Sequence, residues 1–305
     1  MRVLMTSEDL PTAGFLTKPA HSASSKGVAG IVYSVEDPAG EGIARYLRER
    51  LGGRESRRSG GVASWDLDEV NAVLVGFKED VIYFDFLDEV LPDADFYVIL
   101  SRHKAESGVK SLTVHHTGNP TSAAEVGGRP GELSVANPPL AYWVLKSLSR
   151  LAPSDLRDFE VVYEVTHHGP TSLRKPLTFV EIGSSKSEWS AEKAHEVVGE
   201  SVVEALTSMR TQGDCVSTVG FGGPHYAEGF TKRALRLNEC YGHIISRYAV
   251  KELTDSELRT ISRLAALKSS PPAVKAVVMR KVGSNPKALI AEVLRSLSIP
   301  YEVIE

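Results

Sequence analysis

The sequence has few of the residues and segments on which several protein classes depend. Its two cysteines, Cys215 and Cys240, lie 25 positions apart without a CxxC pair, which argues against a disulfide framework and against a thiolate zinc site. No uncharged apolar stretch approaches the roughly 18 residues that a membrane span requires. The N-terminus turns acidic at Glu8 and Asp9 rather than continuing as a leader. We therefore expect a cytoplasmic protein in a reducing compartment.

Thermolabile side chains are also scarce. Glutamine occurs once and methionine only four times among 305 residues, a depletion of the kind reported for hyperthermophile proteins, so we expect a thermophilic source. At 42% hydrophobic residues, a chain of this length can bury a sizeable core without disulfides or metals. No repeat or linker composition interrupts it. We therefore expect residues 1–305 to form a single domain.

The motifs of the common hydrolases are missing as well. The chain contains no HExxH, no GxSxG and no GxxxxGK[ST], so the zincin, serine-hydrolase and P-loop mechanisms lack their sequence signatures. It does contain nine histidines. A histidine-rich site without those motifs indicates that water is activated by a metal or by imidazole itself.

The net charge of −4 conceals two basic segments. Six arginines lie between positions 45 and 58, and eight cations lie between positions 259 and 295 against Glu292 alone. Either segment can contact the phosphates of a nucleic acid, although such a run is usually a solvated face. The residues that we single out for phosphate contact are Arg54, Arg57, Arg58, Arg280 and Lys281.

Short apolar runs alternate with amphipathic segments, which predicts an α/β fold with a central mixed sheet flanked by helices. The predicted strands cover residues 2–7, 29–35, 72–75, 96–100, 112–115, 159–166, 178–182, 215–221, 242–245 and 273–279. The predicted helices cover residues 39–51, 138–151, 191–208, 255–267 and 286–297.

Several histidines come at or just after the carboxyl end of a predicted strand. They are His103, His115, His116, His167, His168 and His225. Ligands of α/β sheets bind beyond such strand ends, so we expect these imidazoles, rather than His21 or His195, to share one cleft. Of the adjacent pair His167 and His168, only one should face the cleft if the segment is extended, since neighbouring side chains then alternate.

Other side chains near these histidines suit hydrolysis. Glu181 is a carboxylate within an apolar strand and can bind a metal, orient a histidine or act as a base, unless it lies on an exposed face of that strand. The amides of Gly222 and Gly223, or the phenol of Tyr226, can stabilise a developing oxyanion.

Six segments resemble the archaeal and plant type of D-aminoacyl-tRNA deacylase. They are residues 101–104 (SRHK), 114–120 (VHHTGNP), 165–171 (VTHHGPT), 180–184 (VEIGS), 220–226 (GFGGPHY) and 242–245 (GHII). The resemblance implies a monomeric, phosphorylase/hydrolase-like α/β domain related in shape to peptidyl-tRNA hydrolase. It also implies hydrolysis of D-aminoacyl-tRNA with broad side-chain tolerance, and zinc as the cofactor, with two ions per chain.

The assignment of roles follows side-chain chemistry. Neutral imidazole is a common zinc ligand, so His103, His167, His225 and Glu181 are the expected metal ligands. The expected catalytic residues are His115, His116, His168, Glu181, Gly222, Gly223, Tyr226 and His243. Two alternatives stay open: a peptidyl-tRNA hydrolase or zinc aminopeptidase of similar architecture, and a non-catalytic tRNA-binding module.

Overall fold

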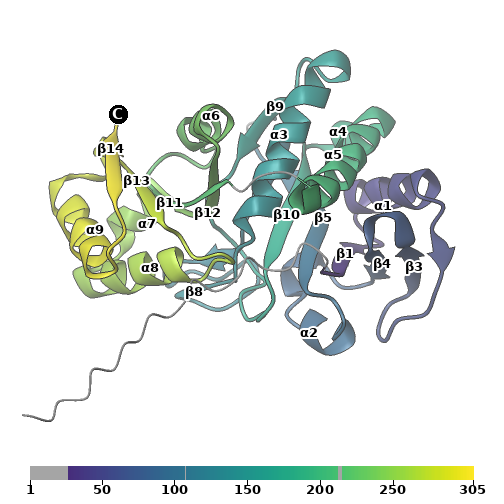
Figure 1. Ribbon diagram of the computed structural model, residues 1–305, viewed down its shortest axis with the longest axis horizontal. Helices are drawn as coiled ribbons and strands as arrows, with labels where there is room; N and C mark the ends of the chain where they lie inside the picture. Colours follow the sequence, from purple (N-terminus) through teal and green to yellow (C-terminus); the bar gives the residue numbers. More distant parts are fainter. Residues whose placement is uncertain (1–26, 107, 212–214) are drawn as a thin grey trace, which may run out of the picture.

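The structure is a computed structural model that describes residues 27–106, 108–211 and 215–305. The strand predicted over residues 2–7 and His21 lie outside the described residues. The described chain contains a large sheet and a smaller one, with helices packed against both (Figure 1). The predicted α/β fold with a mixed central sheet is therefore confirmed.

The large sheet has the strand order β2-β3-β4-β1-β5-β10-β6-β9. Four central strands, β4, β1, β5 and β10, run parallel, whereas β6 is antiparallel to β10. The strands are β1 (Ala29–Ser34), β2 (Arg54–Glu55), β3 (Ala63–Leu67), β4 (Ala72–Phe77), β5 (Phe96–Lys104), β6 (Ser111–His115), β9 (Glu160–Tyr163) and β10 (Leu177–Ser184). Every residue of β10 is buried, as expected for a strand in the middle of a sheet.

Three long helices pack together over the large sheet: α1 (Pro38–Arg50), α3 (Pro138–Asp155) and α5 (Glu192–Thr211). The Asp37 carboxylate begins α1 by accepting hydrogen bonds from the amides of Ala39 and Gly40. Ile43 and Leu47, one turn apart, then bury one face of that helix. The short helices α2 (Leu87–Val90) and α4 (Lys186–Trp189) complete this half. Within the described ranges, no helix is both long and apolar enough to cross a membrane.

The smaller sheet is entirely parallel, in the order β12-β11-β13-β14. Its strands are β11 (Val216–Phe221), β12 (Glu239–Ile245), β13 (Lys275–Met279) and β14 (Tyr301–Ile304), and its helices are α6 (Glu228–Leu237), α7 (Arg247–Glu252), α8 (Asp255–Leu267) and α9 (Ser284–Ser296). The sequence predicted α8 within its observed bounds but missed β14, α6 and α7. A two-stranded ribbon, β7 (Gly118–Asn119) and β8 (Glu132–Leu133), and 3-10 turns at Asp68–Val70, Val81–Tyr83 and Arg280–Val282 account for the remaining elements described.

The segment that follows β9 joins the two sheets. The Val165 amide donates to the His225 carbonyl at 3.0 Å, and the Thr166 amide donates to the Ile244 carbonyl at 2.8 Å. The Ala227 amide returns a hydrogen bond to the Tyr163 carbonyl at 2.7 Å. Residues 164–168 are therefore fixed between the end of β9 and the ends of β11 and β12.

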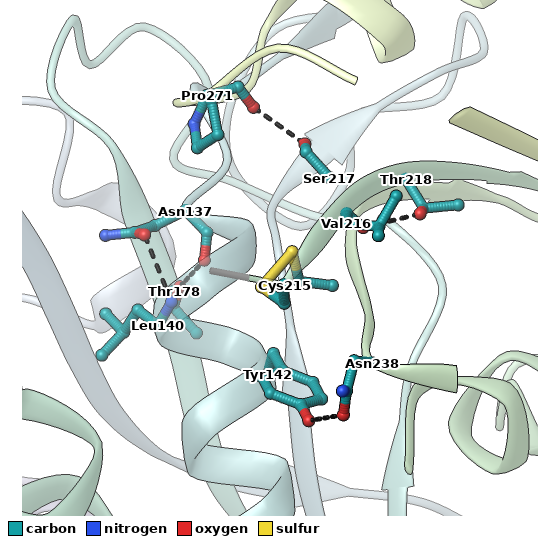
Figure 2. Close-up of a disulfide and its surroundings, with 11 residues drawn as sticks. Asn137, Leu140, Tyr142, Thr178, Cys215, Val216, Ser217, Thr218, Asn238 and Pro271 are labelled. Atoms are coloured by element: carbon teal, nitrogen blue, oxygen red, sulfur yellow. Dashed lines mark hydrogen bonds between the residues drawn. A yellow bond between two sulfur atoms is a disulfide. The ribbon is translucent and has the colours of Figure 1, made fainter. Parts of the chain in front are cut away.

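Cys215 and Cys240 form a disulfide (Figure 2). The sequence argument against a disulfide was wrong. It considered only their spacing along the chain, whereas parallel pairing of β11 with β12 aligns Ser217 with Cys240 and brings Cys215 alongside. The bond ties the beginnings of the two strands together, with Cys240 fully buried.

Removing this disulfide should reduce stability. We expect the double variant Cys215→Ala/Cys240→Ala to lose about 3.5 kcal/mol of unfolding free energy, the loop-closure value for a closed segment of this length. Denaturant unfolding without reductant measures the loss. Wild-type protein unfolded with reductant should match the double variant. Two free thiols titrated in denatured, unreduced wild-type protein would contradict the pairing.

Candidate functional site

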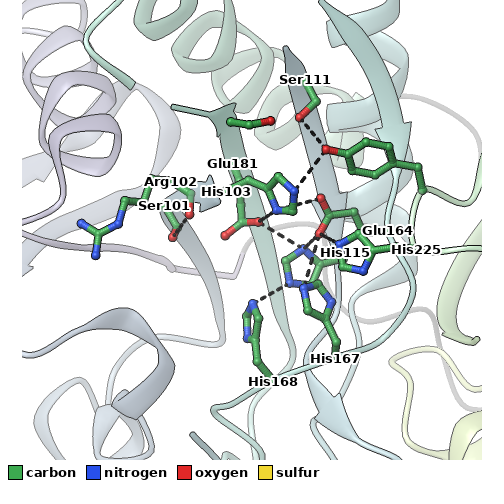
Figure 3. Close-up of polar contacts among 12 residues, drawn as sticks. Ser101, Arg102, His103, Ser111, His115, Glu164, His167, His168, Glu181 and His225 are labelled. Atoms are coloured by element: carbon green, nitrogen blue, oxygen red, sulfur yellow. Dashed lines mark hydrogen bonds and ion pairs between the residues drawn. The ribbon is translucent and has the colours of Figure 1, made fainter. Parts of the chain in front are cut away.

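Five histidines and two glutamates, from strands β5, β6 and β10 and from the segments after β9 and β11, meet where the sheets join (Figure 3). These residues, called the histidine cluster below, are His103, His115, His167, His168, His225, Glu164 and Glu181. The ring of His167 lies 4.5 Å from that of His115 and 4.7 Å from that of His225, centroid to centroid. The predicted gathering of His103, His167 and His225 is confirmed by a centroid distance of 5.6 Å between His103 and His225.

The antiparallel direction of β6 explains the position of the histidine cluster. His115 ends β6 and pairs with Phe179 near the start of β10, while His103 pairs with Gly183 near the end of β10. Glu181 lies between these two positions on the same strand. The cluster therefore lies over β10 and the segment after β9, rather than along one row of strand ends.

Glu164 is the acidic centre of the cluster. One carboxylate oxygen lies 3.1 Å from His103 Nδ1, and the other lies 3.5 Å from both His115 Nδ1 and His225 Nε2 and 3.6 Å from His167 Nε2. Both oxygens are buried, and neither has a hydrogen-bond partner with good geometry among the described residues. The sequence analysis missed this residue. A carboxylate in the apolar run 161–165, three positions before His167, carries the same signal that singled out Glu181.

Glu181 lies on the other side of the cluster, 3.5 Å from His103 Nδ1 and 3.8 Å from His115 Nδ1. Its side chain is only 4% exposed, so the alternative of an exposed strand face is wrong. Burial raises the pKa of Glu181 to about 7; the nearby His103 lowers it and the Glu164 carboxylate raises it further.

Burial lowers the pKa values of three imidazoles of the cluster, those of His115, His167 and His168. Burial also acts to lower the pKa of His103, but the Glu181 and Glu164 carboxylates outweigh it and raise that pKa above its usual value. Burial, reinforced by the neighbouring His168, lowers the pKa of His167 to about 3. Burial also lowers the pKa of His115 well below its usual value, and His115 Nδ1 has no hydrogen-bond partner within the described chain. A neutral imidazole keeps a free lone pair on one nitrogen, and this neutral form is the one that binds a metal.

Both His167 and His168 face the cluster, contrary to the predicted alternation. His168 has φ 43°, in the left-handed region, so the segment is not extended and the two side chains do not alternate. His168 Nε2 lies 3.2 Å from His115 Nε2. The carbonyl of Val165 fixes the His167 ring by binding its Nδ1 at 2.8 Å, which leaves Nε2 toward Glu164.

The donor atoms of the cluster form sets of three that could hold a metal ion, with all atoms of a set within 4.8 Å of one another. The sets are His115, His167 and His168; His103, Glu164 and His225; and His115, Glu164 and Glu181. The first two have no residue in common. Imidazole nitrogens beside the buried Glu164 oxygens, which lack hydrogen bonds with good geometry, fit a divalent cation that prefers nitrogen and oxygen ligands.

Tyr226 and the two glycines differ in their relation to the cluster. The Tyr226 hydroxyl lies 3.2 Å from His103 Nε2 and 3.3 Å from Ser111 Oγ, so it contacts the cluster directly. Gly222 and Gly223 both have positive φ, 109° and 90°, and form the turn that leads from β11 to His225. The Gly222 amide donates to the Ile245 carbonyl at 2.7 Å and is therefore not free to bind an oxyanion.

Three other histidines of the described residues lie outside the cluster. His116 Nδ1 binds the Gly242 carbonyl at 2.9 Å, and its Nε2 lies 3.2 Å from the Thr178 hydroxyl. His243 binds the Thr166 hydroxyl at 3.1 Å and the Ser134 carbonyl at 3.1 Å. These two rings are buried beside each other, 6.2 Å between centroids, whereas His195 binds the Trp189 carbonyl at 2.8 Å. Both ring nitrogens of His116, and both of His243, already have hydrogen-bond partners within the fold.

Comparison with known proteins identifies the family. A sequence model of D-aminoacyl-tRNA deacylase matches residues 90–302, a span that includes every residue of the cluster. The chain belongs to the D-aminoacyl-tRNA deacylase family. It is 43% identical over 277 residues to the D-aminoacyl-tRNA deacylase of Desulfurococcus amylolyticus, covering 89% of this chain and 99% of the relative. It is 44% identical over 261 residues to that of Staphylothermus marinus, covering 85% and 92%.

The fold is likewise shared with a solved structure. The crystal structure of a conserved protein of unknown function superposes with a TM-score of 0.81 at 30% identity, covering 91% of this chain and 95% of that one. The arrangement of both sheets thus also occurs in a second protein. The family model and the two relatives confirm the resemblance noted in the sequence.

In this family member the histidine cluster opens into a cleft of about 330 Å³. One wall is formed by His167, His168 and His225, and another by Tyr248 and Ala249 of α7. The segment 118–126 contributes a third wall that includes Val126. The cleft therefore places solvent and any ligand directly beside the imidazoles.

The two basic segments lie at different distances from this cleft. Arg54 and Arg58 both pair with Asp66, at 2.8 and 2.6 Å, and Arg54 belongs to β2 at the edge of the large sheet opposite β9. Arg280 pairs with Glu305 at 2.8 Å and, like Lys281, directly follows β13. The turn Arg280–Val282 packs against α7, which lines the cleft. The second segment is therefore the nearer one.

Proposed function

We propose that this chain hydrolyses the ester bond of D-aminoacyl-tRNA and releases the free D-amino acid and the tRNA, with broad tolerance for the amino-acid side chain. The observation that carries the proposal is the cluster of imidazoles around the buried Glu164, which opens into a cleft in a member of the D-aminoacyl-tRNA deacylase family. A module that only bound tRNA would need arginine and lysine, not buried histidine. The reaction takes place where aminoacyl-tRNA is found, which we expect to be the cytoplasm.

We assign zinc to the cluster, with two ions per chain. His103, Glu164 and His225 would hold one ion, and His115, His167 and His168 the other, while Glu181 borders both sets. Zinc supplies Lewis-acid chemistry when bound, polarising a carbonyl and making water more acidic. The absence of a free thiol in the described chain agrees with a site built from nitrogen and oxygen ligands.

The protein's own side chains orient the reaction. Glu164 and Glu181 lie against the Nδ1 atom of His103, which fixes the orientation of that ring. The Tyr226 hydroxyl, held between His103 and Ser111, can donate a hydrogen bond to the carbonyl oxygen as negative charge develops on it. We assign this role to Tyr226 rather than to Gly222, because the Gly222 amide is already bonded to Ile245.

We further propose that Arg280 and Lys281 contact tRNA phosphates. They follow β13 beside α7 and the cleft, whereas Arg54, Arg57 and Arg58 lie at or beside β2, at the far edge of the large sheet. An acceptor stem that entered the cleft would pass the nearer segment first.

The deciding experiment compares D-tyrosyl-tRNA with L-tyrosyl-tRNA in the same assay. We expect release of D-tyrosine to exceed release of L-tyrosine by about 100-fold in kcat/KM, the order that pocket shape provides. Prolonged chelation should abolish the activity, and zinc should restore it. N-blocked L-tyrosyl-tRNA and free peptides serve as controls: cleavage of either at a comparable rate would favour a peptidyl-tRNA hydrolase or an aminopeptidase. If the enzyme were active without metal, the zinc assignment would be wrong but the deacylase activity would stand.

A further inference from the structure

An exposed aromatic ring lines the same cleft as three histidines of the cluster. Tyr248 lines the same cleft as His167 and His225, yet 61% of its surface is exposed. Val126, on another wall of the cleft, is 51% exposed. Large apolar or aromatic side chains that stay exposed beside a concave site often mark a ligand contact, because covering their apolar surface is favourable and a ligand can do so.

The position of Tyr248 is fixed although its ring is open. The Ser246 hydroxyl accepts from the Ala249 amide at 3.0 Å, and the Arg247 amide donates to the Gly223 carbonyl at 3.0 Å. Ala249 and Val250 are buried in the core of the smaller sheet. The backbone on both sides of Tyr248 is thus anchored, in part to the loop that carries His225.

The charges around the cleft indicate what the ring contacts. The guanidinium carbon of Arg247 lies 5.4 Å from the centroid of the Tyr248 ring, so one flat cation already packs on it. Glu125 and Glu252 are the acidic residues that line the cleft, and their carboxylates disfavour a phosphate inside it. An uncharged, flat group can pack on this ring without repulsion from the two carboxylates, and the cleft is within the size range of small-ligand pockets.

We propose that Tyr248 stacks on the base of the 3′-terminal nucleotide of tRNA, the nucleotide whose ribose carries the ester. This inference rests on the proposed function and specifies how its substrate is held. Stacking of the base on Tyr248 places the attached ribose, and hence the ester, in the cleft lined by His167 and His225. Aromatic side chains bind bases of single-stranded nucleic acid in this way.

The test is binding of uncharged tRNA, compared with the same tRNA lacking its terminal nucleotide. Wild-type protein should bind the complete tRNA about 10-fold more tightly than the shortened one. Tyr248→Ala should bind both with the lower affinity, whereas Tyr248→Phe, which keeps the ring, should behave as wild type. Because no chemistry is involved, this result is independent of whether the protein proves to be a deacylase.

Two outcomes would overturn the stacking proposal. If Tyr248→Ala slows hydrolysis of D-tyrosyl-tRNA more than that of D-alanyl-tRNA and leaves tRNA binding unchanged, the ring contacts the amino acid and not the base. If neither binding nor hydrolysis changes, the ring has no role in substrate recognition. Since the side chain is largely exposed, the denaturation midpoint of Tyr248→Ala should equal that of wild type, which excludes misfolding as the cause of any loss.

Discussion

Glu164→Ala should lose the metal ion held by His103, Glu164 and His225 and reduce kcat/KM for D-aminoacyl-tRNA by on the order of 1,000-fold, about 4 kcal/mol of transition-state stabilisation. Its carboxylate is the only group of the cluster within 3.6 Å of four different imidazoles. Within the described chain, no other carboxylate forms an ion pair with His225 or His167. Removing it leaves the second set of ligands with two nitrogens and no charge to offset that of the ion.

Glu164→Gln separates the loss of charge from the loss of volume. The amide fills the same space but is neutral, so we expect the same loss of metal and activity. A purely structural Glu164 would give the opposite result, with unchanged metal content in this variant.

Glu188→Gln provides the matched control. Glu188 is also buried and begins α4 by accepting hydrogen bonds from Ser185, away from the cluster. We expect this variant to lose about 1 kcal/mol of stability through its weakened cap while keeping metal and turnover. Elemental analysis and single-turnover deacylation on the three variants make the comparison. Full activity in Glu164→Ala would refute the central role of Glu164.

The sequence was informative about which histidines matter and less so about how they meet. His103, His115, His167 and His225 each follow or end a strand that apolar runs reveal, so their convergence could be predicted. His116 has the same place in the sequence as His115. In the sheet, however, neighbours in a strand point to opposite faces, and His116 turns toward Gly242 while His115 turns toward Glu164. Strand placement alone therefore selected one histidine too many.

Long-range pairing explains the other errors. The disulfide depends on the register of β11 against β12, and the direction of β6 depends on its antiparallel pairing with β10; neither is visible in local periodicity. Strand β14, at the C-terminal edge of the smaller sheet, has a mostly exposed, weakly apolar sequence, which is why its strand character was missed. His168 faces the cluster because of one residue with positive φ, a conformation that the extended-strand rule does not anticipate.

A paired substitution distinguishes ligands from histidines that serve the fold. His225→Ala should lose metal and about 100-fold or more in kcat/KM, yet remain nearly as stable as wild type, because the side chain is 46% exposed and has few contacts to lose. His116→Ala should do the reverse. Its ring is buried and binds the Gly242 carbonyl and the Thr178 hydroxyl, so its removal should cost about 3 kcal/mol of unfolding free energy.

The readouts for this pair are metal content per folded molecule, denaturant unfolding and kcat/KM, measured on both variants. The neutral His116 ring donates from Nδ1 and accepts at Nε2, which leaves no lone pair for a metal; its pKa, lowered by burial to about 4, keeps it in this form at pH 7. His116→Ala should therefore bind as much zinc as wild type. If His116→Ala lost its metal and His225→Ala kept it, the metal would bind beside His116 and His243 and not at the histidine cluster. If His225→Ala kept its metal and lost only turnover, the ring would act on the substrate directly, as a general base, and the zinc would have to be held without it.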